Sequence, residues 1–259
     1  MNDSDLIFGL MASMDKPEYS IADFTWLLKP FGTTETNLRT VLSRMQRKGI
    51  LSSRHEGKTV FYRFSTKGSE IRQNVALGFQ LSDWSDWQNE WWGVLFSVPM
   101  VKHKERYNIR KKLMLYRFAP LYAGFWIRPL NPREQIPRKL ARLCEHNMCR
   151  LIRFKSVAEI SQSEVMRLWK LKQINRQFKR GLQQITESLL KINRLKPDQA
   201  LVEQMILGDI LVKLLFLDPL LPPVYLPDDW ISNTLKDEFA IWLQRIRACS
   251  EPYWSKIFA

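Results

Sequence analysis

Apolar residues recur at helical spacing in three successive runs near the start of the chain. Intervals of three and four residues place side chains on one face of a helix and so predict three amphipathic helices. Ser4, Ser20 and either Thr33 or Thr34 stand where a helix N-cap accepts a backbone N–H. The three sets of apolar positions are Leu6, Ile7, Leu10, Met11 and Met14; Ile21, Phe24, Leu27 and Leu28; and Leu38, Val41, Leu42 and Met45.

Two short β-prone runs follow the third helix. Gly49 is placed to end that helix, and residues 51–54 and 60–64 flank a turn at Glu56-Gly57, which predicts a β-hairpin. Three helices followed by a hairpin is the order of a winged helix-turn-helix, in which the helix after the turn enters the DNA major groove. We assign residues 1–75 to such a DNA-binding domain.

The polar side of the third helix carries the chemistry of phosphate and base-edge hydrogen bonding. Its positions are Thr34, Thr36, Asn37, Arg39, Thr40, Ser43, Arg44 and Arg47. Beyond Glu35 none of the outward positions is acidic, whereas a merely solvated helix usually mixes both signs of charge. Arg54, His55 and Lys58 stand at the hairpin tip, in reach of the neighbouring DNA backbone or minor groove. The alternative is a solvated face on a small helical domain; the order of elements favours DNA binding.

Residues 76–158 alternate between strand and helix patterns. The runs "WWGVLFSVP", "PLYAGFWIRPL" and "CRLIRF" predict three strands, the second around Gly124. The runs "KERYNIRKKLMLYRF" and "PREQIPRKLARLCEHN" predict helices between them. Their inward positions are Tyr107, Ile109, Leu113 and Phe118 on the first helix and Ile136, Leu140 and Leu143 on the second. This alternation indicates a ferredoxin-like α+β middle domain. Trp84, Trp87, Trp91 and Trp92 are interpreted as a core or inter-domain cluster rather than a base-stacking surface.

Residues 159–259 have the pattern of a mostly helical domain. The run "EVMRLWKLKQINRQFKRGLQQITESLLKINRL" predicts one long helical stretch, and a second helix starts after Pro197. "DPLLPPVYLPDDW" is an extended link punctuated by proline. "TLKDEFAIWLQRI" predicts a further helix with Leu235, Phe239, Trp242, Leu243 and Ile246 along one side. This segment fits an effector or dimerisation domain, and equally a scaffold.

The charge of the chain is far from neutral. Its 259 residues carry a formal net charge of +14. Residues 99–155 hold fifteen Lys and Arg against three Asp and Glu, and residues 36–72 hold nine against two. An excess of this size favours a polyanionic partner: nucleic acid, an anionic membrane or a phosphate-rich ligand.

The sequence shows no sign of secretion or of a membrane span. The three cysteines cannot all pair, and the first residues, "MNDSDLIFGL", lack the basic region of a signal peptide. The most apolar late stretch is interrupted by Asp209, Lys213, Asp218 and several prolines. We expect a cytoplasmic protein without membrane association.

Enzymatic chemistry finds little support in the residue pattern. Cys144, His146 and Cys149 have the letters of a zinc site, but no second pair follows at the usual spacing. The chain has three His, and we find neither a Ser/His/Asp arrangement nor a glycine-rich phosphate loop in the right context. We therefore expect no metal, no cofactor and no catalytic residue.

Several motifs together resemble one family. They are "TETNLRTVLSRMQRKGIL", then "WWGVLFSVP" and "KERYNIRKKLMLYRFAPLYAGFWIRP", then "LWKLKQINRQF" and "DPLLPPVYLPDDW". This series resembles the PaaX-like transcriptional regulators over most of the chain. One departure is that Trp230 is followed by Ile-Ser-Asn, without the glycine usual shortly after it.

The resemblance implies a dimeric repressor that binds a palindromic operator through its N-terminal winged helix. It further implies release from DNA by an aryl-acyl-CoA, typically phenylacetyl-CoA. Beside it, the charge of residues 99–155 suggests a surface for the phosphates of an acyl-CoA or of DNA. Its candidate residues are Arg106, Arg110, Lys111 and Arg117.

Two other functions stay open at this point. The first is a metal-dependent nuclease, because the family's middle domain resembles the ferredoxin-like nuclease of CRISPR adaptation. Such nucleases place an Asp just after the first strand, whereas residues 94–99 read "VLFSVP" and offer magnesium no carboxylate. The second is a non-specific basic nucleic-acid-binding protein, which would bind any duplex with similar affinity.

Overall fold

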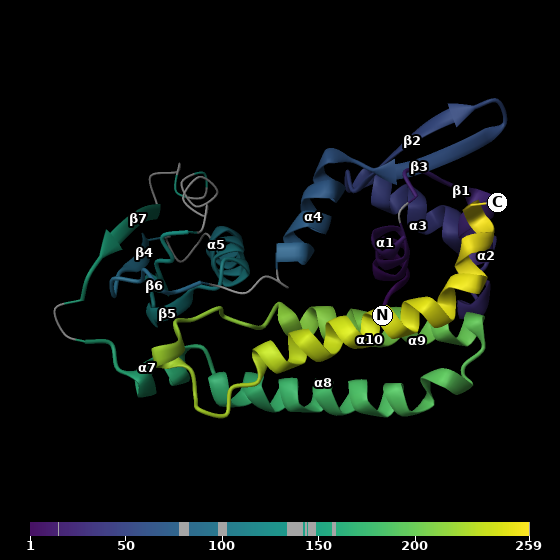
Figure 1. The fold of residues 1–259 in the computed structure, drawn as a ribbon. Coiled ribbons are helices and arrows are strands. Elements are labelled where there is room, and N and C mark those ends of the chain that lie inside the picture. The colour runs from purple at the N-terminus through teal and green to yellow at the C-terminus, as the bar shows by residue number, and fades with distance from the viewer. Residues whose placement is uncertain are drawn as a thin grey trace. The chain divides into compact units, whose positions relative to one another are not determined.

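The structure is a computed structural model that describes residues 1–14, 16–77, 83–97, 103–133, 142, 144, 149–156 and 159–258. The fold is α+β, with many helices and two small antiparallel sheets (Figure 1). The chain divides into two compact units. Unit 1 comprises Met1–Gln80, Gln177–Leu217 and Ile231–Ala259, and unit 2 comprises Leu81–Arg176 and Asp218–Trp230. The division into domains 1–75, 76–158 and 159–259 stays a proposal.

Unit 1 begins with the three predicted helices and the predicted hairpin, together with a short strand, a 3-10 helix and a fourth helix that the pattern did not predict. They are α1 Asp3–Ser13, β1 Tyr19–Ser20, α2 Ile21–Leu28, the 3-10 helix η1 Lys29–Phe31, α3 Glu35–Arg47, β2 Leu51–Glu56, β3 Thr59–Phe64 and α4 Thr66–Leu77. Strand β3 lies between β1 and β2, and both pairings are antiparallel. The two-residue strand β1 therefore turns the expected hairpin into a three-stranded sheet.

The first two helices begin at side-chain caps. The Ser20 hydroxyl accepts the Asp23 N–H at 3.1 Å, and the Asp23 carboxylate accepts the Ser20 N–H at 2.7 Å, so that a capping box starts α2 as expected. The predicted cap of the first helix was wrong. Asn2, and not Ser4, accepts the Asp5 N–H at 2.9 Å, and α1 begins two residues earlier. Asn and Ser cap helices about equally well, so the local sequence did not separate them.

One apolar core joins the N-terminal helices to the end of the chain. All the predicted apolar positions of the three helices are buried except Ile21, which packs against the core from its edge. The same core contains Leu201, Met205, Trp254 and Ile257. Helices from the last third of the chain therefore complete the hydrophobic core of the first third.

The remaining helices of unit 1 come from the last third of the chain. They are α8 Leu171–Lys191 from Gln177 onward, η2 Ile192–Arg194, α9 Pro197–Leu215, α10 Ser232–Trp254 and η4 Ser255–Phe258. Helix α10 lies along α9 (Figure 1). The Trp242 indole N–H donates to the Ser188 hydroxyl at 2.9 Å, and the Ser250 hydroxyl donates to the side-chain oxygen Oε1 of Gln204 at 2.6 Å. These buried hydrogen bonds fix the register of α10 against α8 and α9, because a buried polar group without a partner is costly.

Unit 2 is built on a four-stranded antiparallel sheet. Its strands, in spatial order, are β5 Ala119–Tyr122, β6 Phe125–Pro129, β4 Trp91–Phe96 and β7 Cys149–Phe154, and α5 His103–Leu115 follows β4 in the chain. The first and third strands of the chain order, β4 and β6, are central, as in a ferredoxin-like sheet. Gly93 in β4 admits close neighbours, because a Cβ there would lie 2.6 Å from Cε2 of Phe125.

A tryptophan cluster forms the core on one side of this sheet. Trp87 meets Trp84 and Trp91 edge to face, with ring centroids 6.1 and 6.2 Å apart, and Trp91 lies 6.5 Å from Trp169. The 3-10 helix η3 Pro223–Tyr225 and the short helix α7 Gln162–Leu168 pack here through Tyr225 and their other apolar side chains. Trp87 and Trp91 therefore lie in this core with Trp84 against Trp87, whereas Trp92 packs against the separate core that contains Val94 and Trp126.

Two elements that the sequence predicts as continuous, a strand and a long helix, are each divided into two in the structure. The single strand around Gly124 is the hairpin β5–β6, and a Cβ on Gly124 would lie 2.8 Å from the Phe96 carbonyl oxygen. The single helical stretch is broken between α7 and α8 at Lys170, which has a φ of 55°. The Trp169 indole N–H donates to the Arg117 carbonyl at 3.0 Å, so tertiary packing of this ring accompanies the break.

The first helix of the middle segment packs only partly as expected. Leu113 and Phe118 are buried and Ile109 packs against them, but Tyr107 is 64% exposed and its predicted inward position was wrong. The inward positions predicted for the second helix lie outside the described residues.

Within the described ranges, no helix combines the length and apolarity that crossing a bilayer requires.

Candidate nucleic-acid interface

The polar side of α3 faces solvent along the whole helix. All eight of its predicted positions are exposed: Thr34, Thr36, Asn37, Arg39, Thr40, Ser43, Arg44 and Arg47. The opposite stripe, Leu38, Val41, Leu42 and Met45, is at most 2% exposed. The helix is thus held by one side and leaves its hydrogen-bonding side open to a partner.

The ends of α3 place donors where an anion would approach. The Thr34 hydroxyl caps the helix by accepting the Asn37 N–H at 3.3 Å, and the positive end of the helix dipole lies in this first turn. Arg44 and Arg47 lie in the last turn, and Gly49 follows it with a φ of 69°. Cationic side chains therefore extend the donor surface to the far end of the helix.

Helix α1 contacts two of the polar side chains of α3. The Asn37 side-chain amide donates to the Asp3 carboxylate at 2.8 Å, and the Arg44 guanidinium donates to the Ser4 hydroxyl at 3.1 Å. Sequence reasoning missed Asp3 and Ser4, because these partners lie 34 and 40 residues away and no local pattern links them. The bond to Asp3 uses one of the two N–H groups of the Asn37 amide and leaves the other N–H and the oxygen for a further partner.

The other charged groups of this face are held weakly. Arg39 donates to the Glu35 carboxylate at 3.0 and 2.5 Å, with 60% of the arginine side chain exposed, and exposed ion pairs of this kind contribute little stability. Arg47 and Ser43 form no side-chain hydrogen bond with any described residue. The phosphates of a duplex can therefore engage both arginines at little cost to the fold.

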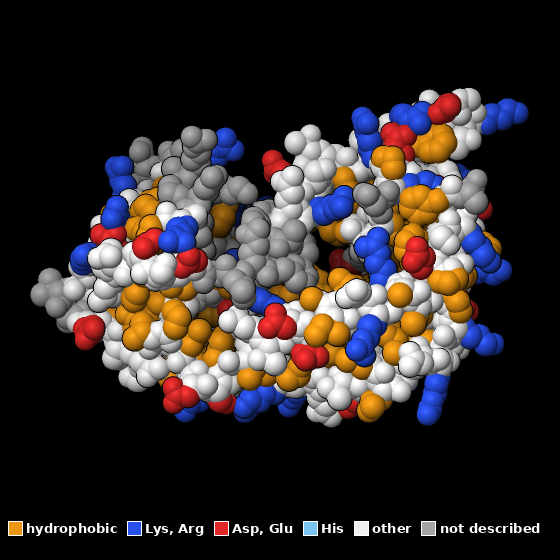
Figure 2. Space-filling view, viewed as in Figure 1, with side chains coloured by type: hydrophobic (Ala, Val, Ile, Leu, Met, Phe, Trp, Pro, Cys, Tyr) orange, Lys and Arg blue, Asp and Glu red, His pale blue; other side chains and the backbone are white. Residues whose placement is uncertain are grey.

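Of the three polar residues predicted at the hairpin tip, Arg54 is held by hydrogen bonds, and His55 and Lys58 are exposed. Arg54 donates to the Glu56 carboxylate at 2.5 Å and to the Glu18 carboxylate at 2.6 Å. The hydrogen bond to Glu56, and after it the one to Glu18, raises the pKa of Arg54. His55 and Lys58 are exposed, and their side chains form no hydrogen bond or ion pair with the described part of the chain. Lys and Arg side chains project from this hairpin at the upper right of Figure 2. Glu18 is a further residue that sequence reasoning missed.

The basic candidates of the middle segment lie in unit 2. Arg106 and Arg110 lie one turn apart on α5 and are half-buried, and Lys111, next to Arg110, is exposed. The Nε atoms of both arginines are buried and have no hydrogen-bond partner among the described residues. Arg117 follows the helix with a φ of 63° and donates from Nε to the Asp218 carbonyl at 2.8 Å. It therefore links the end of α5 to the proline-rich link, whereas Arg106, Arg110 and Lys111 form the basic surface of α5, of which Lys111 is the exposed residue.

The cysteine cluster has the geometry of a thiol pair. The Sγ atoms of Cys144 and Cys149 are 3.0 Å apart, and burial, together with the neighbouring Cys144, raises the pKa of Cys149 to about 12. His146 lies outside the described residues. Where side chains are described, no group of three or more His, Cys, Asp or Glu is arranged to hold a metal ion.

Three models of one protein family match successive parts of the chain. The family model for "PaaX-like protein" matches residues 5–68, that for the "PaaX protein central Cas2-like domain" matches residues 85–166, and that for the "PaaX-like protein C-terminal domain" matches residues 169–256. The Transcriptional repressor PaaX of Escherichia coli (strain K12) is 23% identical over 242 residues, which cover 89% of this chain and 75% of that protein.

A solved structure has a similar fold. The uncharacterized protein Rv0674 from Mycobacterium tuberculosis aligns with a TM-score of 0.65 over 96% of this chain and 97% of its own, at 19% identity. The fold thus defines a class of α+β proteins with N-terminal helices and a hairpin, a central antiparallel sheet and C-terminal helices. Together the three matches cover nearly the whole sequence, and the chain belongs to the PaaX-like protein family.

Proposed function

We propose that the protein is a transcriptional repressor that binds duplex DNA through the polar face of α3 and the tip of the β2–β3 hairpin. The observation that carries the proposal is the two-sided character of α3. Its apolar stripe is buried, and its Thr, Asn, Ser and Arg side chains are all exposed. In a winged helix-turn-helix this helix enters the major groove and the hairpin reaches the flanking backbone.

The finer parts of the proposal follow the family. The protein binds a palindromic operator as a homodimer, acts in the bacterial cytoplasm, and is released by an aryl-acyl-CoA such as phenylacetyl-CoA. The basic surface of α5, with Arg106, Arg110 and Lys111, supports a phosphate-bearing ligand or a DNA backbone contact. We propose no enzymatic activity, because the carboxylate expected after the first strand of the nuclease fold is missing from residues 94–99.

Selection from a random duplex pool tests the DNA-binding part. Duplexes retained by the protein at 150 mM salt, a concentration chosen as roughly physiological, are sequenced and then measured against a shuffled duplex of equal composition. We expect a motif with two-fold symmetry and a preference of about 10³-fold or more over the shuffled duplex. Equal affinity for both duplexes would establish a non-specific binder instead, and cleavage of DNA with Mg²⁺ or Mn²⁺ would establish a nuclease.

The effector is tested on the selected duplex. Phenylacetyl-CoA is added to the complex, with equimolar phenylacetate plus free CoA as the matched control. We expect the thioester alone to release the DNA, because only it joins the aryl group to the CoA phosphates. Release by free CoA, or no release by phenylacetyl-CoA, contradicts the effector assignment and leaves the operator result intact.

A further inference from the structure

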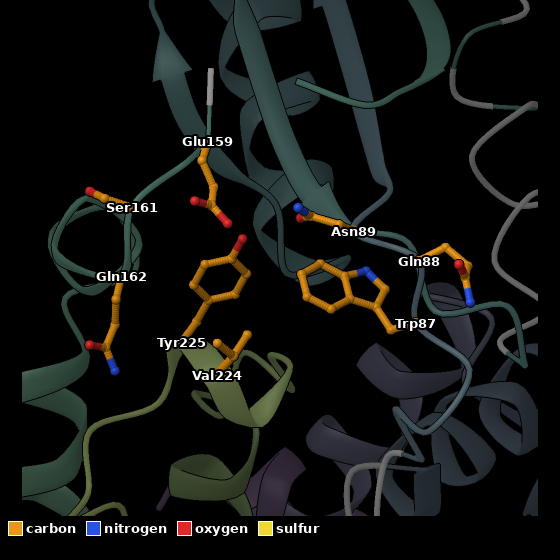
Figure 3. A pocket seen from close by; sticks show the side chains of 8 residues that line it. All are labelled: Trp87, Gln88, Asn89, Glu159, Ser161, Gln162, Val224 and Tyr225. Atoms are coloured by element: carbon orange, nitrogen blue, oxygen red, sulfur yellow. The ribbon is translucent and has the colours of Figure 1, made fainter. Parts of the chain in front are cut away.

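Unit 2 contains an open pocket away from the basic surface of α5. Its volume is about 610 Å³, and the side chains that line it come from the segment before β4, the segment before α7, and η3 (Figure 3). They are Trp87, Gln88, Asn89, Glu159, Ser161, Gln162, Val224 and Tyr225. Neither Lys nor Arg is among the described residues that line it, in a chain with 40 of these residues.

The aromatic side of the pocket is rigid. Trp87 and Tyr225 meet edge to face with centroids 5.6 Å apart, and Trp91 packs 5.5 Å from Tyr225. The Trp87 indole N–H donates to the Glu90 carbonyl at 3.1 Å, which fixes the orientation of the ring. Two fixed aromatic rings offer a cation the negative charge of their π-systems.

Among the described residues of the lining, the one charged side chain is acidic. Glu159 is exposed and its carboxylate points toward the Tyr225 hydroxyl (Figure 3). By contrast, Asp83 and Asp86 of unit 2 pair with Arg133, and Glu90 pairs with Arg153. Glu159 forms no ion pair with any described residue. A carboxylate without a counter-ion in a strongly basic protein favours a cationic partner from solution.

The Tyr225 hydroxyl faces the same space without a protein partner. The residue is 5% exposed, and its hydroxyl makes no hydrogen bond with the described part of the chain. Burial, and then the negative charge of Glu159, raises the pKa of Tyr225 to about 12, so the phenol stays neutral near pH 7. The ring is buried while the hydroxyl lies at the pocket, where it can donate a hydrogen bond to a ligand.

Amide side chains complete the polar edge. The Gln162 side-chain N–H donates to the Leu226 carbonyl at 3.0 Å, which leaves its own carbonyl oxygen as an acceptor. Asn89 has a φ of 57°, a left-handed conformation that Asn tolerates better than most residues. Gln162 and Asn89 therefore add uncharged polar groups to the lining.

We propose that this pocket binds a small organic cation, a primary amine carried on an aromatic body. The ammonium group lies between Glu159 and the Tyr225 hydroxyl, and the apolar body lies against Trp87 and Val224. The site does not suit the phosphates of an acyl-CoA, because its lining, as far as the structure describes it, contains no cationic side chain. The proposal does not depend on repressor function, since binding is measured without DNA.

Three probes of nearly equal size but different charge test whether the pocket selects its ligand by charge. Benzylamine, benzyl alcohol and benzoate, which are a cation, a neutral molecule and an anion near pH 7, are titrated into the full-length protein by calorimetry, with saturation-transfer NMR in parallel. We expect benzylamine to bind about tenfold more tightly than benzyl alcohol, and benzoate not to bind. Equal binding of the alcohol, tighter binding of benzoate, or no binding of benzylamine overturns the proposal.

Two conservative variants locate the site. Glu159→Gln removes the charge and keeps the size, and we expect it to abolish the preference for benzylamine over benzyl alcohol. Tyr225→Phe keeps the ring and is expected to weaken benzylamine severalfold. The matched control is Glu164→Gln, a carboxylate on α7 that lies outside the lining and 3.8 Å from Arg167. Loss of benzylamine binding in the control equal to that in Glu159→Gln would place the amine elsewhere and overturn the assignment.

Discussion

Trp26 and Tyr253 hold each other by two reciprocal hydrogen bonds across a stacked ring pair. The Trp26 indole N–H donates to the Tyr253 carbonyl at 3.1 Å, and the Tyr253 hydroxyl donates to the Trp26 carbonyl at 2.9 Å. Their centroids are 5.1 Å apart and their planes 17° from parallel. Residues 227 positions apart thus fasten the end of α10 to α2, the helix that precedes α3.

The first prediction concerns this contact. Tyr253→Phe removes one hydrogen bond and is expected to lower the free energy of unfolding by about 1 kcal/mol. Tyr253→Ala removes the stacked ring as well and is expected to cost about 3 kcal/mol, at the low end for an aromatic side chain because Tyr253 is only half-buried. Urea unfolding followed by tryptophan fluorescence measures both. Tyr107→Ala, at a 64% exposed ring, is the control and should stay within about 0.5 kcal/mol.

The second prediction concerns phosphate contact by α3. Arg47→Ala is expected to weaken binding to selected and shuffled duplexes alike and to reduce the slope of log affinity against log salt by about 1, since one phosphate contact is lost. Affinities at several salt concentrations measure this slope. Arg180→Ala removes an equal charge from an exposed position on α8 and should leave the slope unchanged. An unchanged slope in the Arg47 variant would contradict a phosphate role.

The third prediction concerns sequence readout. Asn37→Ala removes a side chain near the start of α3 that can form two hydrogen bonds to a base edge, so we expect about 1–3 kcal/mol of lost affinity for the selected duplex. The affinity for the shuffled duplex should hardly change, because no base is read there. Binding of the variant to single-base substitutions of the operator identifies the position whose discrimination is lost. Equal losses on both duplexes would assign Asn37 to the backbone instead.

The fourth prediction compares two glycines. A Cβ on Gly93 would lie 2.6 Å from Phe125 and 2.9 Å from Ile152, so Gly93→Ala is expected to destabilise unit 2 by about 1–3 kcal/mol through overpacking. Gly208 lies within α9 and a Cβ there meets nothing within 4 Å. Gly208→Ala is therefore expected to be stabilising by up to about 1 kcal/mol, because alanine is the better helix former. Thermal unfolding of both variants checks the opposite signs.

The fifth prediction concerns alkaline pH. The pKa of Tyr225 rises from the ordinary 10.0 to about 12 in the folded protein, so its contribution to stability is complete below pH 10 and is lost as the pH rises to about 12. The difference in unfolding free energy between the wild type and Tyr225→Phe should therefore decline over this window. Urea titrations at several pH values measure it, with Tyr107→Phe as the exposed control. A constant difference would contradict the raised pKa.

Local patterns predicted most elements and one whole face of the candidate interface. The stripe from Leu38 to Met45 and the polar residues opposite it follow from helical spacing alone, because positions three and four apart share a face whatever the rest of the chain does. The Ser20 cap was equally local. The two errors at Lys170 and Gly124 arose where a distant group decides the backbone: Trp169 packs against Arg117, and Gly124 approaches the carbonyl of Phe96.

By itself, then, the sequence determined the amphipathic helices, the strand-rich middle and the basic charge that favours a polyanion. Only the tertiary structure brought Tyr253 to Trp26, Asp3 to Asn37, and Glu159 to Tyr225. The physical reason is the range of each effect. Caps and periodicity act within about four residues, whereas the choice of long-range partners depends on how the whole apolar surface is buried at once.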